Sequence, residues 1–443
     1  MRRTLAVLVA VAVVAAACGG AERSIDEEVD APEFLTDRNG GPTTARALRG
    51  RPYNQSARNL DNRGLARFAA GAEPFDQFFL EAEGLGPDHD GTGCLSCHLD
   101  GTKVSTSAHR DRPPGLIVRI SLPGTDVDGR SQRPVPTYGL QLTPESTHGD
   151  PEASIELRWT PVNHRRVDGS IVELRRPSIE IEPHRGELPA ETLVSPRVTP
   201  PMIGLGLLEA IPESSLREAV AAQSNAGEVS GRLNEVIESD TGELVPGRFG
   251  WKAGQYSVES QTVAALHGDL GLTTPDDVVA GELSDLTREE LDELVFYNRT
   301  IAVPISRGAE RAMVRKGANL FESIGCSACH TPTHNSGPDE IAALSNVVFH
   351  PYTDLLLHDM GERLADGRPE FSASGSEWRT PPLWGLGRRV EITGAEAFLH
   401  DGRARTPEEA IYWHDGEARA ARHRFELLGD ADAQALLAFL DSL

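Results

Sequence analysis

Apolar side chains at helical spacing mark three segments of the chain. In residues 313–324 they recur every three or four positions, which predicts an amphipathic helix. Residues 287–301 begin with a Thr-x-x-Glu capping box, and their apolar stripe continues until Pro304 stops it. A third apolar face closes the chain over 436–443. These patterns lead us to expect a mainly α fold.

The pattern changes to alternation in a stretch of about 115–195. Apolar and polar residues alternate from Ile155 to Trp159, Asp168-Gly169 supplies a turn, and an extended pattern resumes at Ile171. We therefore expect a β-rich insertion within the first part of an otherwise helical chain.

The most apolar run lies at the N-terminus. It extends from Leu5 to Ala17 behind two arginines and is too short to span a bilayer, so it predicts an export signal at residues 1–17. The run ends in Ala-Ala-Ala-Cys-Gly, which is similar to the lipobox of bacterial lipoproteins. We expect a periplasmic protein that contacts the membrane only through a lipid on Cys18. Residues 18–60 then form a flexible tether.

Length and charge narrow the classes of function. A chain of 443 residues allows two or three domains, and 39% hydrophobic with 25% charged residues is typical of a folded, water-facing protein. Lys+Arg 43 against Asp+Glu 67 gives a net charge of -24, which would repel a phosphate backbone. Nucleic acid is therefore excluded as a partner.

Cysteine spacing gives the strongest chemical signal. Apart from Cys18, the cysteines form two C-x-x-C pairs, and a histidine follows each pair directly. The motifs are Cys94-Leu95-Ser96-Cys97-His98 and Cys326-Ser327-Ala328-Cys329-His330. This spacing is typical of covalent haem c attachment, because two thiols reach the vinyl groups of one porphyrin while the next imidazole binds its iron. We predict two haem c groups with His98 and His330 as proximal ligands.

Two other uses of paired cysteines fit less well. A four-cysteine zinc site would not require a histidine after both pairs. A thioredoxin-like C-x-x-C belongs to a βαβ context, which the sequence lacks.

An internal repeat divides the chain. Arg197 to Gly206 echoes Arg379 to Gly387, and further on Phe249 to Glu259 matches Phe398 to Glu408. The second match pairs Trp251 with His400 and places Gln261 beside Ala410. We place one domain at residues 61–304, with the insertion inside it, and the other at 305–443.

At this point the motif order resembles the bacterial di-haem cytochrome c peroxidase superfamily. The closest resemblance is to its di-haem oxidoreductase branch of peroxidase-like proteins, sometimes labelled thiol oxidoreductases. The similarity spans about residues 60–443. It rests on the segments Ser195 to Ile211, Gly247 to Lys252, Asp354 to Gly361, Arg379 to Gly387 and His400 to Ala404.

The resemblance implies two cytochrome c-like haem domains with different tasks. One haem reacts with peroxide, the other receives electrons, and an aromatic residue lies on the path between them. Trp251 falls where relatives place that aromatic residue, and Gln261 matches their distal glutamine. Some relatives also hold a calcium ion between the domains.

The sixth iron ligands stay open between several residues. For the second haem, the resemblance places His414 where the peroxidases carry a methionine, and an imidazole there should lower the reduction potential. Met360 is the alternative, followed by His358 and His400.

For the first haem the candidates are His109, which lies shortly after His98, and His267. If His267 stays unligated, it could carry the proton that peroxide cleavage requires, and Asp269 could assist.

These observations lead us to expect an exported di-haem peroxidase that reduces hydrogen peroxide or a related oxidant. Its electrons would come from a small redox protein such as a cytochrome c. Two other functions also fit the motifs: a purely electron-transferring cytochrome, and an oxidase or oxygenase acting on a protein or organic substrate.

Overall fold

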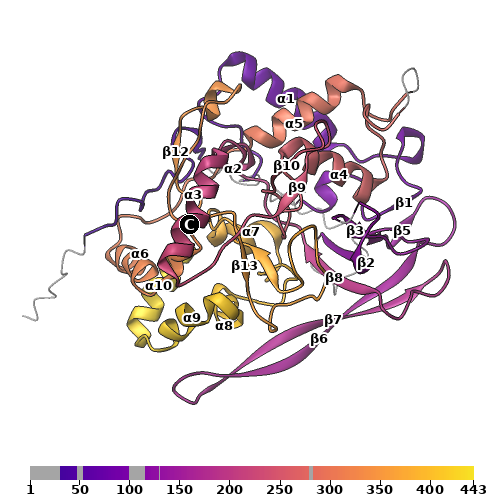
Figure 1. Cartoon of the computed structure of the whole chain (residues 1–443). Helices are drawn as coiled ribbons and strands as arrows, with labels where there is room; N and C mark the ends of the chain where they lie inside the picture. The colour runs from indigo at the N-terminus through magenta and orange to yellow at the C-terminus, as the bar shows by residue number, and fades with distance from the viewer. Residues whose placement is uncertain (1–29, 47–52, 99–114, 129, 279–282) are drawn as a thin grey trace, which may run out of the picture.

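The computed structural model describes residues 30–46, 53–98, 115–128, 130–278 and 283–443 (Figure 1). Its α-helices are α1 (Asn62–Asp76), α2 (Leu205–Glu209), α3 (Glu213–Ala226), α4 (Val258–Leu270), α5 (Arg288–Thr300), α6 (Ala312–Ser323), α7 (Arg389–Thr393), α8 (Pro407–Trp413), α9 (Arg419–Glu426) and α10 (Asp430–Ser442).

The strands are mostly short and form several small sheets. They are β1 (Asp88–His89), β2 (Leu116–Thr125), β3 (Gln132–Arg133), β4 (Gln141–Leu142), β5 (Glu145–Ser146), β6 (Ala153–Arg165), β7 (Ile171–Pro183), β8 (Leu193–Val198), β9 (Glu235–Ile237), β10 (Leu244–Pro246), β11 (His334–Asn335), β12 (Val348–Phe349), β13 (Leu357–Asp359) and β14 (Glu377–Arg379).

The prediction of a mainly α protein made of two cytochrome c-like domains is wrong. The chain is only 33% helical and 20% strand, and its strands are spread over several sheets. The apolar stripes predicted helices correctly in places, but helices make up only a third of the chain. The two- and three-residue strands are too short to display an alternation in the sequence, and some of them pair with segments far along the chain, as β1 does with β5.

Two pairs of helices pack closely against each other, and a glycine allows the close approach in each pair. In Figure 1, α1 lies beside α5 and α6 beside α10. A Cβ atom on Gly71 in α1 would lie 1.9 Å from the carbonyl oxygen of Glu293 in α5. A Cβ atom on Gly317 in α6 would lie 2.0 Å from the carbonyl oxygen of Ala435 in α10. Each pair therefore packs backbone against backbone.

This contact predicts a strong effect of a single methyl group. Gly317→Ala should lower the free energy of unfolding by about 1–3 kcal/mol, because the two helix backbones must move apart. Gly268→Ala is the matched control, since a Cβ atom at Gly268 in α4 meets only the Gln141 side chain, at 3.9 Å. That variant should be neutral or gain up to about 1 kcal/mol from helix propensity. Denaturant unfolding of both proteins would compare them, and equal stability would contradict this packing.

The two repeat segments exchange hydrogen bonds across the molecule. In the first half of the chain (residues 61–304) Phe249 bridges to Gln255, and in the second half (residues 305–443) Phe398 bridges to Ala404. The backbone N–H of Arg379 donates to the carbonyl of Trp251 at 2.9 Å, and that of Val198 donates to the carbonyl of His400 at 2.7 Å. The two repeat units are therefore joined by backbone hydrogen bonds between their equivalent segments.

Strands β6 and β7 form one long antiparallel ribbon. It pairs from Ala153 with Pro183 to Arg165 with Ile171, and Figure 1 shows it crossing below α8 and α9. His164 on the ribbon pairs with Glu426 of α9 at 2.8 Å. The Arg175 side chain donates to second-half carbonyls. The insertion therefore belongs to the first half of the sequence, but its β6–β7 ribbon contacts residues of the second half.

The sheet around β2 separates an apolar core from a polar face. Val118 and Ile120 are fully buried in the core, together with Leu142 of β4. Strand β2 pairs antiparallel with β8, so Arg119 lies opposite Ser195 while Ile117 lies opposite Arg197. Because side chains alternate along a strand, both arginines face away from that core.

The described part of the expected tether is packed against the body. Phe34 is 6% exposed and contacts the rings of Tyr352 and Phe439 edge-on. Asn39 is fully buried and donates to Ser306 at 2.7 Å. Residues 30–46 therefore belong to the folded structure, which corrects the prediction of a free tether there. The signal segment and Cys18 lie outside the described residues. Among the described helices, none is both long and apolar enough to cross a bilayer.

Candidate functional site

Both C-x-x-C-H motifs line one cavity of about 800 Å³. This volume lies at the upper end of ligand pockets, which are ~300–1,000 Å³. Each motif folds as a short 3-10 helix, η3 (Cys94–Ser96) and η4 (Cys326–Ala328). The N–H of His98 then donates to the carbonyl of Cys94 at 2.8 Å, and that of His330 to Cys326 at 3.0 Å. This turn brings both cysteines and the histidine of a motif to the same cavity wall, and the four thiols are not in disulfides.

The two motif histidines are neutral imidazoles. Burial lowers the pKa of His98 to about 4 and that of His330 to about 4. The Nδ1–H of His330 donates to the carbonyl of Tyr352 at 3.0 Å. A carbonyl only accepts hydrogen bonds, so Nδ1 carries the proton and Nε2 keeps its lone pair. This is the tautomer that an iron ligand requires.

His414 and Met360 both line the cavity near the second motif. His414 follows α8, and its Nδ1–H donates to the carbonyl of Ala410 at 2.6 Å. Its Nε2 is therefore the unprotonated nitrogen, as in His330, and its charge state influences the pKa of His330. Met360 follows β13 and packs against the apolar cluster that contains Trp413 and Phe425. Both His414 and Met360 are therefore candidates for the sixth ligand of the second haem.

His358 and His400 are engaged in other interactions. The two ring nitrogens of His358 contact Asp354 at 2.9 Å and Glu417 at 2.8 Å. Burial alone would lower the pKa of His358, but hydrogen bonds to these carboxylates and to Cys329 raise it to about 12. A doubly protonated ring has no lone pair for iron. His400 Nε2 lies 3.2 Å from an Asp401 carboxylate oxygen.

Trp251 lies on the cavity wall between the halves. Its indole N–H donates to the carbonyl of Val198 at 2.8 Å, which fixes the orientation of the ring. The ring of its repeat partner, His400, lies 6.4 Å away edge-on, and His400 stacks on Trp378 at 3.7 Å. All three rings line the cavity that both motifs share.

Helix α4 divides the predicted catalytic residues between two faces. Gln261 lines the cavity, whereas His267 does not. The His267 side chain is 36% exposed and pairs with Asp277. The structure thus places His267 on the exposed side of α4, outside the lining of the cavity that both motifs share.

The acidic residue that α4 presents to the cavity is Asp269. Gln141 of β4 donates to its carboxylate at 2.8 Å and also to Asp90 at 2.5 Å. Burial raises the pKa of Asp269, which favours the protonated form. Burial raises the pKa values of Cys94 and Cys97, and the Asp269 carboxylate raises them further because it lies beside the first motif.

A family model described as "Di-haem oxidoreductase, putative peroxidase" matches residues 147–286 and 277–443. These ranges contain the second motif, Trp251, α4 and the repeat segments. The chain belongs to this di-haem oxidoreductase family. The family suspected from the motif order is confirmed.

Other comparisons with this oxidoreductase add little. No curated protein matches it. Among solved structures, the hydrazine synthase of Kuenenia stuttgartiensis pressurised with xenon is similar, with 15% identity over 56% of this chain and 73% of that chain. Its TM-score is 0.32, which does not establish a shared fold.

The donor set of the oxidoreductase fits two haems. Each site offers two thiols and one neutral imidazole on a shared wall, which is the chemistry of haem c attachment and iron ligation. The residues that would hold the groups are Cys94, Cys97 and His98 for one, and Cys326, Cys329 and His330 for the other.

His109 lies outside the described residues. For the expected calcium ion, no group of three or more His, Cys, Asp or Glu side chains in the described part could hold a metal.

Proposed function

We propose that this oxidoreductase is an exported di-haem c-type peroxidase. It reduces hydrogen peroxide, or a related oxidant, with electrons from a small redox protein such as a cytochrome c. The observation that carries this proposal is the single cavity that both C-x-x-C-H motifs share, because it joins an electron-accepting site to a site with a proton donor. Export rests on the N-terminal apolar run, and attachment to the membrane rests on Cys18.

Reducing hydrogen peroxide to water takes up two electrons and two protons. When bound, haem supplies the redox chemistry, while the protein supplies position, protons and electrostatics. Asp269 is the group that can hold a proton beside the first motif, because burial favours its protonated form. Gln141 fixes that carboxyl, and Gln261 adds an amide on the same wall. Generic acid–base groups of this kind contribute ~10²–10⁴-fold to rate.

Trp251 is the proposed electron relay between the two sites. Trp251→Phe keeps an aromatic ring but removes the indole and its hydrogen bond to Val198. We expect slower electron transfer between the haems with both haems retained, as measured by stopped-flow reduction of the resting protein. Trp159→Phe is the control, because Trp159 packs near Trp251 and stacks with Arg175 on the ribbon but does not line the cavity. Equal rates for Trp251→Phe and the unaltered protein would remove the relay role.

His414 is our choice for the sixth ligand of the second haem. His414→Ala should change the ligand-field spectrum of one haem while both haems stay covalently attached. Its Nε2 lone pair is available since Nδ1 is held by Ala410. Met360→Ala is the matched variant and should leave the spectrum unchanged. The opposite result would make Met360 the ligand.

Peroxide titration of the half-reduced protein tests the function itself. A peroxidase should show rapid, stoichiometric oxidation by peroxide and a high-spin or exchangeable first haem. Two low-spin haems that stay inert to peroxide would instead identify an electron-transferring cytochrome. Oxidation of an added organic or protein substrate would identify an oxidase or oxygenase.

A further inference from the structure

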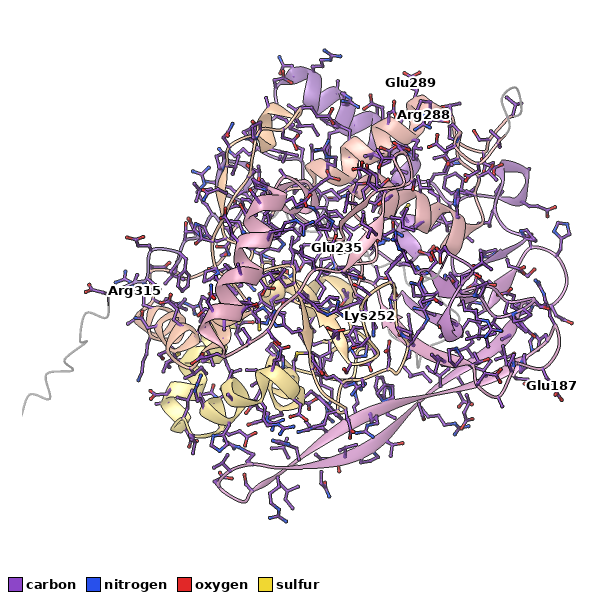
Figure 2. The ribbon with its side chains drawn as sticks, in the orientation of Figure 1. Glu187, Glu235, Lys252, Arg288, Glu289 and Arg315 are labelled. Carbon is purple, nitrogen blue, oxygen red and sulfur yellow. The ribbon has the colours of Figure 1, made fainter. Side chains whose placement is uncertain are left out.

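A group of buried charges lies where the two halves meet, next to the cavity. The first half contributes Arg197 from β8 and Lys252, which directly follows Trp251. The second half contributes Asp366, Arg368 and Glu370 from the loop between β13 and β14. In Figure 2 Lys252 lies in the interior of the molecule. The side chains of Lys252 and Arg368 are 0% and 2% exposed.

Lys252 is fully satisfied within the protein. Its ammonium group donates to an Asp366 carboxylate oxygen at 3.0 Å and to the carbonyls of Arg368 at 2.9 Å and Ser374 at 2.7 Å. Three acceptors use all three N–H bonds. Lys252 therefore fixes the loop of the second half and has no donor left for a ligand.

The two arginines are not satisfied. Arg197 donates to Glu370 at 2.7 Å and to Ser195 at 3.0 Å, but its Nη2 has no hydrogen-bond partner among the residues that the structure describes. That nitrogen lies 3.7 Å from Asp366, which is beyond hydrogen-bond distance. Arg368 donates to Glu370 at 3.0 Å through Nη1, and within the described part of the chain its Nε is also unpartnered. Both arginines line the cavity.

This group of side chains also carries a net positive charge. Lys252, Arg197 and Arg368 are cationic, whereas only Asp366 and Glu370 are anionic. A further cation stands close by: Arg119 lines the cavity on the sheet face that carries Arg197, and it acts electrostatically on both Glu370 and Asp269. Buried cations without a counter-charge are costly, so this wall favours an anion.

We propose that Arg197 and Arg368, assisted by Arg119, form a carboxylate-binding site between the halves. A hydrogen bond from a guanidinium N–H to a carboxylate is charge-assisted and is roughly twice as strong as a bond between neutral groups. The carboxylate would accept from the unpartnered Nη2 of Arg197 and Nε of Arg368. A propionate at the edge of a haem and the carboxylate of a small organic ligand share this chemistry. The proposal rests on the proposed function only in that the cavity holds haem.

Two measurements on the purified protein with both haems attached separate these sources. The first is spectroelectrochemical titration of each haem in Arg197→Gln and Arg368→Gln. If a propionate is the ligand, one haem should shift to a lower potential, because a cation that opposed the oxidised iron is lost. The second is titration of the resting protein with acetate and with benzoate, followed in the Soret band. A free carboxylate ligand should give a saturable change that both variants lose.

Arg403→Gln is the matched control. Arg403 is 5% exposed and pairs with Asp401 through two nitrogens, yet it does not line the cavity. It should change neither measurement, which separates carboxylate binding from the loss of a buried ion pair. Arg119→Gln provides a second test if Arg197→Gln does not fold, since within the described residues Arg119 makes no ion pair that its loss would break.

A potential shift without an acetate or benzoate response assigns the site to a propionate. A lost response with unchanged potentials assigns it to a small carboxylate ligand. Unchanged potentials and no saturable response, or equal shifts in Arg403→Gln, would overturn the site. A protein that fails to turn over peroxide but still shows the shift would refute the peroxidase proposal and leave this site intact.

Discussion

Replacing Cys326 and Cys329 together by alanine is expected to leave one covalently bound haem per chain instead of two. The two thiols lie on one wall of the cavity beside His330, and neither is tied up in a disulfide. Without them no thioether bond can form at the second site, although the imidazole remains. Intact mass spectrometry and pyridine haemochrome analysis would count the haems in each protein.

The fifth cysteine supplies the control for that experiment. Cys18→Ala removes a thiol that belongs to neither motif, so two haems should remain. The reciprocal pair, Cys94→Ala with Cys97→Ala, should also leave one haem, now at the second site. If any of the paired variants keeps the mass of two haems, or if the unaltered chain carries none, covalent attachment at these motifs is refuted.

The haem-attachment motifs and the helix cap could be predicted from the sequence, because both depend on residues that are close together in the chain. The C-x-x-C-H spacing identified two local motifs, and each folds as a short 3-10 helix that brings two thiols and an imidazole to the cavity. The helix after the capping box at Thr287 is present as α5, which begins at Arg288. The fold class failed because strand pairing is not local. For example, β1 pairs with β5 through contacts more than fifty residues apart along the chain.

The sequence was sufficient to predict that Asp269, and not His267, lines the cavity. On a helix, residues four apart share a face, so the stripe that begins at Gln261 continues through Ala265 to Asp269. His267 lies on the other side of that stripe. Helical spacing from Gln261 therefore indicates the carboxylate, whereas chemical preference for an imidazole indicated the histidine.

The site formed by Arg197 and Arg368 could not be predicted from helical spacing or from a sequence motif. Arg197 and Glu370 are 173 residues apart and approach to 2.7 Å only because β8 packs against a loop of the second half. The Arg197 and Arg379 segments repeat in sequence, yet their side chains have different partners. Arg379 donates to the carbonyl of Gly250 at 2.8 Å, whereas Arg197 pairs with a carboxylate. After a duplication, equal motifs need not keep equal roles.

Asp269→Asn is expected to lower kcat/KM for hydrogen peroxide by ~10²–10⁴-fold. The amide keeps the size of the carboxyl and can still bond to Gln141, but it cannot give or take a proton. Both haems should stay attached, and their resting spectra should match those of the unaltered protein. Steady-state peroxide reduction with a small cytochrome c as donor would measure the loss.

His267→Gln is the matched variant on the same helix, and it makes the Asp269 experiment decisive. The His267 ring pairs with Asp277 at the surface and does not line the cavity, so its loss should leave turnover close to that of the unaltered protein. Asp269→Glu should restore part of the activity, because it returns a titrating carboxyl at a longer reach. A large loss in His267→Gln with full activity in Asp269→Asn would reverse the assignment and return the proton to the histidine. Loss in neither variant would mean that the proton reaches peroxide from water, and the peroxidase mechanism would need no acid on α4.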